Sequence, residues 1–174
     1  ERINELESML KNKEEASRLL KDKIASALRG FTDKGITVVE RNGKIYVSME
    51  AQLLFASGKT NVNSEGERAI VDLAVVLESQ TDIDILVEGH TDADPFGGKG
   101  DLLDNLDLST KRATSVARVL IKNKVPAEKI VASGRGDSKP VASNETKEGK
   151  SKNRRTEIIL SPNLEKLLEL IQTK

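Results

Sequence analysis

The sequence predicts an α/β sandwich in which a mixed β-sheet carries helices on one face. Two observations indicate this fold class. Short apolar or β-branched runs at residues 36–40, 45–49, 83–88, 130–132 and 155–160 alternate with helical patterns at 64–80 and 108–123. Strands and helices in such an order form a sheet with helices packed against it. Aromatic residues make up only 2% of the chain, so we expect an aliphatic core.

Residues 1–31 are expected to form a separate helix ahead of this domain. Their apolar residues recur with a period of about 3.5, the spacing of coiled coils, and Lys13 and Ser17 interrupt the series. A stalk helix that pairs with a second copy fits this pattern. An amphipathic helix that packs on its own domain fits it equally well. The apolar positions are Ile3, Leu6, Leu10, Leu20, Ile24, Leu28 and Phe31.

Local signals set the other boundaries. Asn42 and Gly43 lie between two β-branched runs and predict a hairpin, because both central residues of a type I′ turn need positive φ. Ser64, followed by Glu67, predicts a capping box at the start of the first domain helix, and Ser109 is expected to cap the second. The predicted parts are therefore a helix at 1–31, a domain at 36–162 and an amphipathic helix at 163–174.

Composition excludes several classes of function. The chain has 28 basic and 28 acidic side chains, so it lacks the basic surplus that nucleic-acid binding usually requires. It has no cysteine, which excludes disulfide scaffolds and thiolate metal sites. No apolar run approaches the roughly 18 residues of a membrane-spanning helix, and no signal peptide is visible. Since the chain starts at Glu1, we expect a membrane anchor to lie outside this fragment, ahead of it.

The segment after the run at 83–88 carries the polar residues of most interest. Ligand sites in α/β sheets gather at the carboxyl ends of strands. Asp92 lies just beyond this strand, and Arg112 lies near the start of the helix that follows. A carboxylate and a guanidinium at one end of a sheet suit a ligand with both an ammonium and a carboxylate group. A simple Asp92–Arg112 salt bridge explains the pair equally well, and the spacing leaves both interpretations open.

A metal-dependent hydrolase is a weaker alternative. His90, Asp92 and Asp94 alternate along one short segment, and alternate residues of an extended chain face one way. A hydrolytic metal site needs three or four ligands and an open position, but this chain has one histidine and no cysteine. We favour a structural His90 that bonds the loop backbone. No nucleophile and base can be paired convincingly, so we expect no catalytic residues, no metal and no cofactor.

Residues 90–160 resemble the OmpA-like domain. The family pattern is Thr-Asp, a loop, Leu-Ser, two residues, Arg-Ala, two residues, Val, three residues and Leu. A second match, Asn153 to Arg155, precedes the last strand, and the resemblance extends over about residues 45–161. The positions that match the first pattern are Thr91, Asp92, Leu108, Ser109, Arg112, Ala113, Val116 and Leu120.

The resemblance implies a βαβαββ fold and non-enzymatic binding of peptidoglycan through the diaminopimelate of its stem peptide. In the family, the aspartate and the arginine hold the ammonium and the carboxylate of that side chain, which implies these roles for Asp92 and Arg112. Asn105, Thr91 and Arg154 match residues that complete the site. The implied setting is the periplasm of a Gram-negative bacterium, where the domain would anchor an envelope protein to the wall.

Two departures from the family pattern qualify this expectation. The loop between Asp92 and Leu108 has 15 residues, longer than the short form and closer to the MotB-like branch. A stator-like wall anchor of an inner-membrane motor is therefore the alternative function. Ala56 and Gly58 occupy positions where family members often carry Asp and Asn. One side of the site is thus expected to differ in its contacts.

Overall fold

The structure is a computed structural model that describes residues 1–172, apart from the side chains of residues 166, 167 and 170. The strands are β1 (Ile36–Arg41), β2 (Lys44–Glu50), β3 (Ile83–His90), β4 (Ile130–Gly134) and β5 (Arg155–Pro162). The helices are α1 (Arg2–Ala27), α2 (Ala51–Leu54), α3 (Ser64–Glu78), α4 (Asn105–Lys122), α5 (Lys147–Asn153) and α6 (Glu165–Gln172). Single 3-10 turns occupy η1 (Arg29–Lys34) and η2 (Ala127–Lys129). Over residues 1–172, no helix combines the length and apolarity that crossing a bilayer requires.

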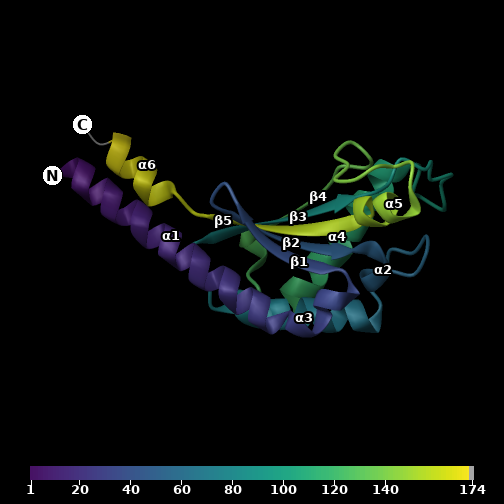
Figure 1. The fold of residues 1–174 in the computed structure, drawn as a ribbon, viewed down its shortest axis with the longest axis horizontal. Helices are drawn as coiled ribbons and strands as arrows, with labels where there is room; N and C mark the ends of the chain where they lie inside the picture. Colours follow the sequence, from purple (N-terminus) through teal and green to yellow (C-terminus); the bar gives the residue numbers. More distant parts are fainter. Residues whose placement is uncertain (173–174) are drawn as a thin grey trace.

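The five strands form one mixed sheet in the order β1-β2-β5-β3-β4. β3 and β4 are parallel, and the other neighbours are antiparallel. α4 packs on β3 and β4, α3 packs on α4, and α1 packs on α3 and the β1–β2 hairpin. Figure 1 shows α1, α3 and α4 gathered along the sheet. The predicted fold class, a mixed sheet with packed helices, is confirmed.

The core between the sheet and these helices is aliphatic, as expected. Val47, Ile158 and Val87 lie in one row across β2, β5 and β3, and all three are fully buried. Leu73 of α3 and Val116 of α4 are buried in the same cluster. Burial of each such side chain stabilises the fold by about 1.5–3 kcal/mol before entropy is counted.

The hairpin between β1 and β2 forms at the predicted residues. Asn42 has φ 53° and Gly43 has φ 75°, and Arg41 faces Lys44 across the turn. Positive φ at both central residues matches the right-handed twist of the flanking strands. The turn therefore fixes the register in which Val47 faces the core.

Both predicted helix caps are wrong by position. Asn63, not Ser64, caps α3, and its side chain accepts a hydrogen bond from the backbone N–H of Gly66 at 2.8 Å. Asp104, not Ser109, caps α4 by accepting from the N–H of Asp107 at 3.0 Å. Asn and Asp are as good at this position as Ser. In both helices the residue that caps the helix is the one that comes earlier in the chain. α4 consequently starts earlier than predicted and carries Ser109 in its second turn.

The N-terminal helix packs on its own domain over part of its length, which is one of the two arrangements that the sequence left open. Its C-terminal half buries Leu20 and Ile24 against the domain, whereas Ile3 remains 70% exposed and Leu10 51% exposed. Figure 1 shows this N-terminal half running past the edge of the sheet, at the same end as α6. The predicted helix at 1–31 ends as an α-helix at Ala27, and the predicted C-terminal helix is observed over Glu165–Gln172. Residues 173 and 174 of that prediction lie outside the described residues.

Candidate functional site

The site is built where α4 crosses the carboxyl ends of β3 and β4. A Cβ on Gly89 would lie 2.1 Å from the carbonyl oxygen of Ser109, and one on Gly134 would lie 2.1 Å from the Thr110 hydroxyl oxygen. Only glycine permits this approach of helix and sheet. The hydroxyl of Ser109 also accepts a hydrogen bond from the N–H of Gly136 at 2.9 Å. The start of α4 is thus fixed directly over the end of β3.

A cavity of about 600 Å³ opens at this end of the sheet. Its walls come from α2 and the segment after it, from the segment after β3, from α4 and from the end of α5. All five site residues expected from the sequence line this cavity, namely Thr91, Asp92, Asn105, Arg112 and Arg154. Segments as far apart in the chain as Ala51 and Arg154, which are 103 positions apart (154 − 51), therefore line one cavity.

Arg112 is the most unusual group in the cavity wall. It is only 7% exposed, and its Nε donates to the carbonyl of Lys59 at 2.9 Å. Its guanidinium carbon lies 4.9 Å from the centre of the Phe55 ring. Burial, together with the charge of Arg154, lowers the pKa of Arg112. Among the described residues, no carboxylate pairs with this guanidinium, and its two terminal nitrogens make no hydrogen bond. A buried positive charge therefore faces the cavity, and its N–H donors are available to a ligand.

Asp92 pairs with Arg154 and not with Arg112. The Asp92 carboxylate is 6% exposed, and its Oδ2 accepts from Arg154 Nη1 at 2.6 Å. Its Oδ1 accepts from the N–H of Asp94 at 3.1 Å. The salt bridge between Asp92 and Arg112, one of the two interpretations of the sequence, is therefore wrong. The cavity presents two guanidinium groups and one paired carboxylate at its centre.

The rim residues hold the loop after β3 in place. The Thr91 hydroxyl donates to the carbonyl of Asp92 at 2.8 Å, and the side-chain amide of Asn105 donates to the carbonyl of Asp94 at 2.9 Å. Asp94 forms an ion pair with Lys150 of α5 at 2.9 Å. Thr91 and Asn105 thus each fix the backbone that carries Asp92.

The model of one known family matches residues 54–154, which is more than half of the chain, and its description is the OmpA family. The chain belongs to the OmpA family. The matched range covers every residue of the cavity wall after α2.

Similar proteins come from several envelope systems. The chain is 36% identical to "Probable lipoprotein YiaD" of Escherichia coli K12 over 80% of its own length and 60% of that protein. It is 34% identical to motility protein B of Bacillus subtilis over 68% of its length and 45% of that protein. The cell wall anchor of the T6SS from Pseudomonas aeruginosa has a similar structure, with a TM-score of 0.73 and 30% sequence identity. The match covers 80% of this chain and 97% of that chain. The chain thus spans about half to three fifths of these two curated relatives.

In this OmpA-family chain, the three side chains of the second motif, Asn153 to Arg155, have three different roles. Asn153 is fully buried and its Oδ1 accepts from the N–H groups of Val141 and Ala142 at 2.7 and 3.0 Å. Arg154 enters the cavity. Arg155 turns to the opposite side of the sheet, where its Nε donates to Glu157 at 2.8 Å. Consecutive residues of a strand end alternate between faces, which separates the two arginines.

Part of the cavity wall was not predicted from the sequence. Ala51, Gln52 and Phe55 belong to or follow α2, a helix of four residues. So short a helix has no periodic pattern that sequence analysis can detect. The helix α5 was missed for the same reason, although Thr146 caps it by accepting from Gly149 N–H. A capping threonine three residues before Gly149 was the one local signal available.

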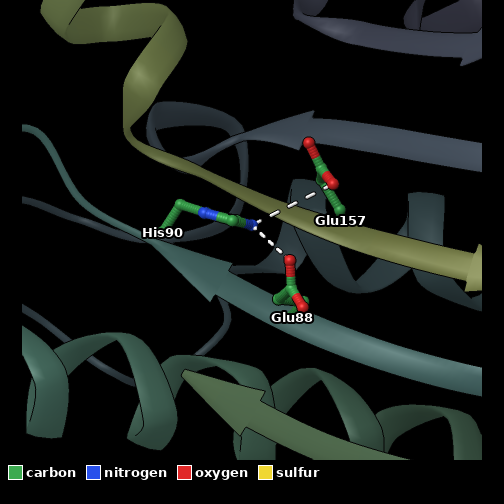
Figure 2. Close-up of side chains that lie close together, drawn as sticks. All are labelled: Glu88, His90 and Glu157. Atoms are coloured by element: carbon green, nitrogen blue, oxygen red, sulfur yellow. Dashed lines mark ion pairs between the residues drawn. The ribbon is translucent and has the colours of Figure 1, made fainter. Parts of the chain in front are cut away.

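His90 does not join Asp92 and Asp94, so the metal site considered for these three residues does not form. Asp92 and Asp94 are paired with Arg154 and Lys150. Gly89 faces α4, so His90 and Glu88 extend from β3 on the opposite side, toward Glu157 of β5 (Figure 2). The expectation that His90 bonds the loop backbone is also wrong, because neither of its ring nitrogens makes a hydrogen bond with the described residues.

Proposed function

We propose that this chain binds peptidoglycan non-covalently through the cavity at the end of β3 and so anchors an envelope protein to the cell wall. The observation that carries the proposal is Arg112. A buried guanidinium with two unengaged terminal nitrogens and no carboxylate partner among the described residues is costly for the fold alone. A ligand carboxylate would satisfy it in a bidentate, charge-assisted geometry.

The ligand that fits this cavity carries an ammonium group beside its carboxylate. The side chain of diaminopimelate ends in both groups, and the expected contacts are Arg112 with the carboxylate and Asp92 with the ammonium. Asp92 forms an ion pair with Arg154 in the structure. The Arg154 side chain is 41% exposed, so it is free to turn toward the stem peptide when the ammonium arrives. Thr91 and Asn105 would hold the loop that presents Asp92.

The similar proteins support this assignment. One is the cell wall anchor of the T6SS from Pseudomonas aeruginosa, and another, with TM-score 0.53, 28% identity and coverage of 63% of this chain and 88% of that chain, is the peptidoglycan-associated lipoprotein from Burkholderia pseudomallei. Both names describe attachment and not turnover. A binding role also agrees with Arg112 and Asp92, whose opposite charges are suited to hold the carboxylate and the ammonium group of a ligand. We therefore infer a wall-binding module and not an enzyme.

Calorimetric titration with a short diaminopimelate-containing stem peptide tests the proposal. We expect saturable binding with Kd between about 1 µM and 1 mM, because the contacts are few and only partly shielded from water. Arg112→Gln and Asp92→Asn should each weaken binding at least about tenfold, since each removes one charge-assisted contact. A lysine-containing peptide, which lacks the second carboxylate, should bind more weakly than the diaminopimelate peptide.

Arg118→Gln is the matched control, because Arg118 lies on the exposed side of the same helix. It should bind like the wild type. Equal affinity for the lysine and diaminopimelate peptides would contradict the role given to Arg112. Absence of binding to both the peptide and isolated cell-wall sacculi would contradict the proposal as a whole.

A stator-like anchor in an inner-membrane motor is the second candidate function. The similarity to motility protein B supports it, as does the long loop between Asp92 and Leu108. Wall binding through the same cavity is common to both candidates, so the difference lies in the membrane to which the parent protein is attached. Fractionation of the envelope with the full-length protein separates them: the inner membrane supports a stator-like anchor, and the outer membrane supports a lipoprotein tether in a Gram-negative periplasm.

We also propose that two copies pair through the N-terminal half of α1. Ile3 and Leu10 lie on one stripe of this helix and are exposed beyond the domain. Burial of such a stripe against a second helix is the usual way in which it is removed from water. Pairing would join two wall-binding cavities and raise the effective affinity for a polymeric wall.

A further inference from the structure

A second cluster of charged side chains lies on the face of the sheet opposite α4. Glu88 and His90 extend from β3 and Glu157 extends from β5, and Figure 2 shows their side chains converging above the sheet. One carboxylate oxygen of each glutamate and one ring nitrogen of His90 all lie within 4.8 Å of one another. All three residues are buried. The function proposed above uses none of them.

Two arginines set the orientation of the carboxylates. Arg135 Nε lies 3.0 Å from Glu88 Oε2, and Arg155 Nε lies 2.8 Å from Glu157 Oε1. The remaining oxygens face His90, with Glu88 Oε1 at 3.0 Å from Nε2 and Glu157 Oε2 at 4.0 Å. Each glutamate is therefore held from outside and keeps one oxygen for the centre of the cluster. Outer contacts of this kind orient the residues that bind the ion in metal sites.

His90 supplies independent evidence that the cluster is incomplete. It is only 3% exposed, and neither ring nitrogen makes a hydrogen bond within the described residues, since the contact with Glu88 is close but not aligned as one. A buried imidazole whose ring nitrogens make no hydrogen bond is unfavourable. Burial, followed by the charge of Arg155, lowers the pKa of His90 although both glutamates oppose this. An imidazole nitrogen is also the commonest side-chain ligand of metal ions in proteins.

We propose that Glu88, His90 and Glu157 form a binding site for a divalent cation, with Zn²⁺ as the ion that the ligand set favours. Zinc accepts imidazole nitrogen and carboxylate oxygen at about 2.0–2.2 Å. Ligands at that distance are about 3–3.5 Å apart, close to the two measured separations from His90 Nε2. A small shift of Glu157 completes the set. Three protein ligands leave one tetrahedral position for water.

The surrounding charges limit the expected affinity. Arg135 and Arg155 already balance the two carboxylates, and Arg155 is buried with the cluster. The Arg135 side chain is 43% exposed, so water screens its charge. A bound cation would thus meet one poorly screened guanidinium, and we expect Kd on the order of 10 µM and not the far tighter binding of a site without such neighbours.

The test is titration of the chelator-stripped chain, residues 1–174, with zinc chloride alone, followed by calorimetry and by NMR of histidine labelled with ¹⁵N. The chain contains one histidine, so the labelled ring signals report on His90 without ambiguity. We expect one equivalent of Zn²⁺ to bind and to shift the ring nitrogen signals at the same ratio. Failure of the wild type to bind zinc, or binding that leaves the His90 signals unchanged, would overturn the proposal.

His90→Gln and Glu157→Gln should each weaken zinc binding at least about tenfold, whereas Glu128→Gln, which alters an exposed carboxylate on η2, should not. Undiminished binding in Glu157→Gln would place the ion elsewhere and overturn the proposal, even if His90→Gln fails to fold. The site lies on the other face of the sheet from the cavity, so Glu157→Gln should bind stem peptide like the wild type. Success or failure of the zinc test is therefore separate from that of the wall-binding test.

Discussion

Arg112 shows how a single binding residue can destabilise the fold. Its charge is buried and lacks an acidic partner within the described chain, and burial lowers its pKa. We expect Arg112→Met to change the free energy of unfolding by less than about 1 kcal/mol, because the lost hydrogen bond to Lys59 and the lost contact with Phe55 are offset by removal of the desolvated charge. Urea denaturation measures this.

The same variant should abolish stem-peptide binding in calorimetry. Removing one partner of a buried ion pair would instead cost about 3–5 kcal/mol. A loss of that size in Arg112→Met would show that Arg112 stabilises the fold directly. Arg112 would then not need a ligand carboxylate to complete its environment.

His90 gives a prediction for the pH dependence of stability. Burial and Arg155 lower its pKa in the folded chain below the usual value near 6.5, against the opposing influence of Glu88 and Glu157. The unfolded chain therefore binds more protons around and below pH 6.5, so stability is fully present above that pH and is lost as the pH falls. One proton contributes a slope of at most about 1.4 kcal/mol per pH unit.

Urea denaturation between pH 5.5 and 7.5, with EDTA present, measures this slope. The wild type should lose stability toward pH 5.5, and His90→Gln should have the shallower dependence. Equal slopes in the two proteins would mean that His90 titrates as it does in the unfolded chain.

The junction of α4 with β3 and β4 is the element-scale feature on which the cavity depends. Gly89→Ala places a methyl group 2.1 Å from the Ser109 carbonyl oxygen, and neither backbone can yield without moving the start of α4. We expect a loss of about 3 kcal/mol in unfolding free energy, together with weaker peptide binding because Arg112 and Asp92 separate. Gly97→Ala is the control, since no atom lies within 4 Å of its added methyl group. Equal melting of the two variants would contradict this account.

Elements with strong local signals could be predicted, and contacts between distant segments could not. The turn at Asn42 and Gly43 follows from residue type alone. The cap of α3 was misplaced because Asn63 and Ser64 are adjacent and equally suitable. Resemblance to a family, and not spacing, gathered the five site residues that line the cavity. The pairing of Asp92 with Arg154 joins positions 62 residues apart, and no sequence pattern favours it over a pairing with Arg112.

At the scale of the whole molecule, α1 and α6 project from one end of the sheet (Figure 1), and the cavity lies at the other end, beside α2 and the end of α5. We expect the chain to form a dimer at tens of micromolar, measured by sedimentation equilibrium, because Ile3 and Leu10 lose contact with water when two α1 helices pair. Ile3→Asp combined with Leu10→Asp should give a monomer with unchanged affinity for a single stem peptide. The same double variant should be retained less well by sacculi, since only a dimer engages two stem peptides at once.

Asp22→Asn, on the exposed side of the docked half of α1, is the control and should remain dimeric. A wild type that is monomeric at all concentrations, or a double variant that stays dimeric, would show that the exposed stripe has another use.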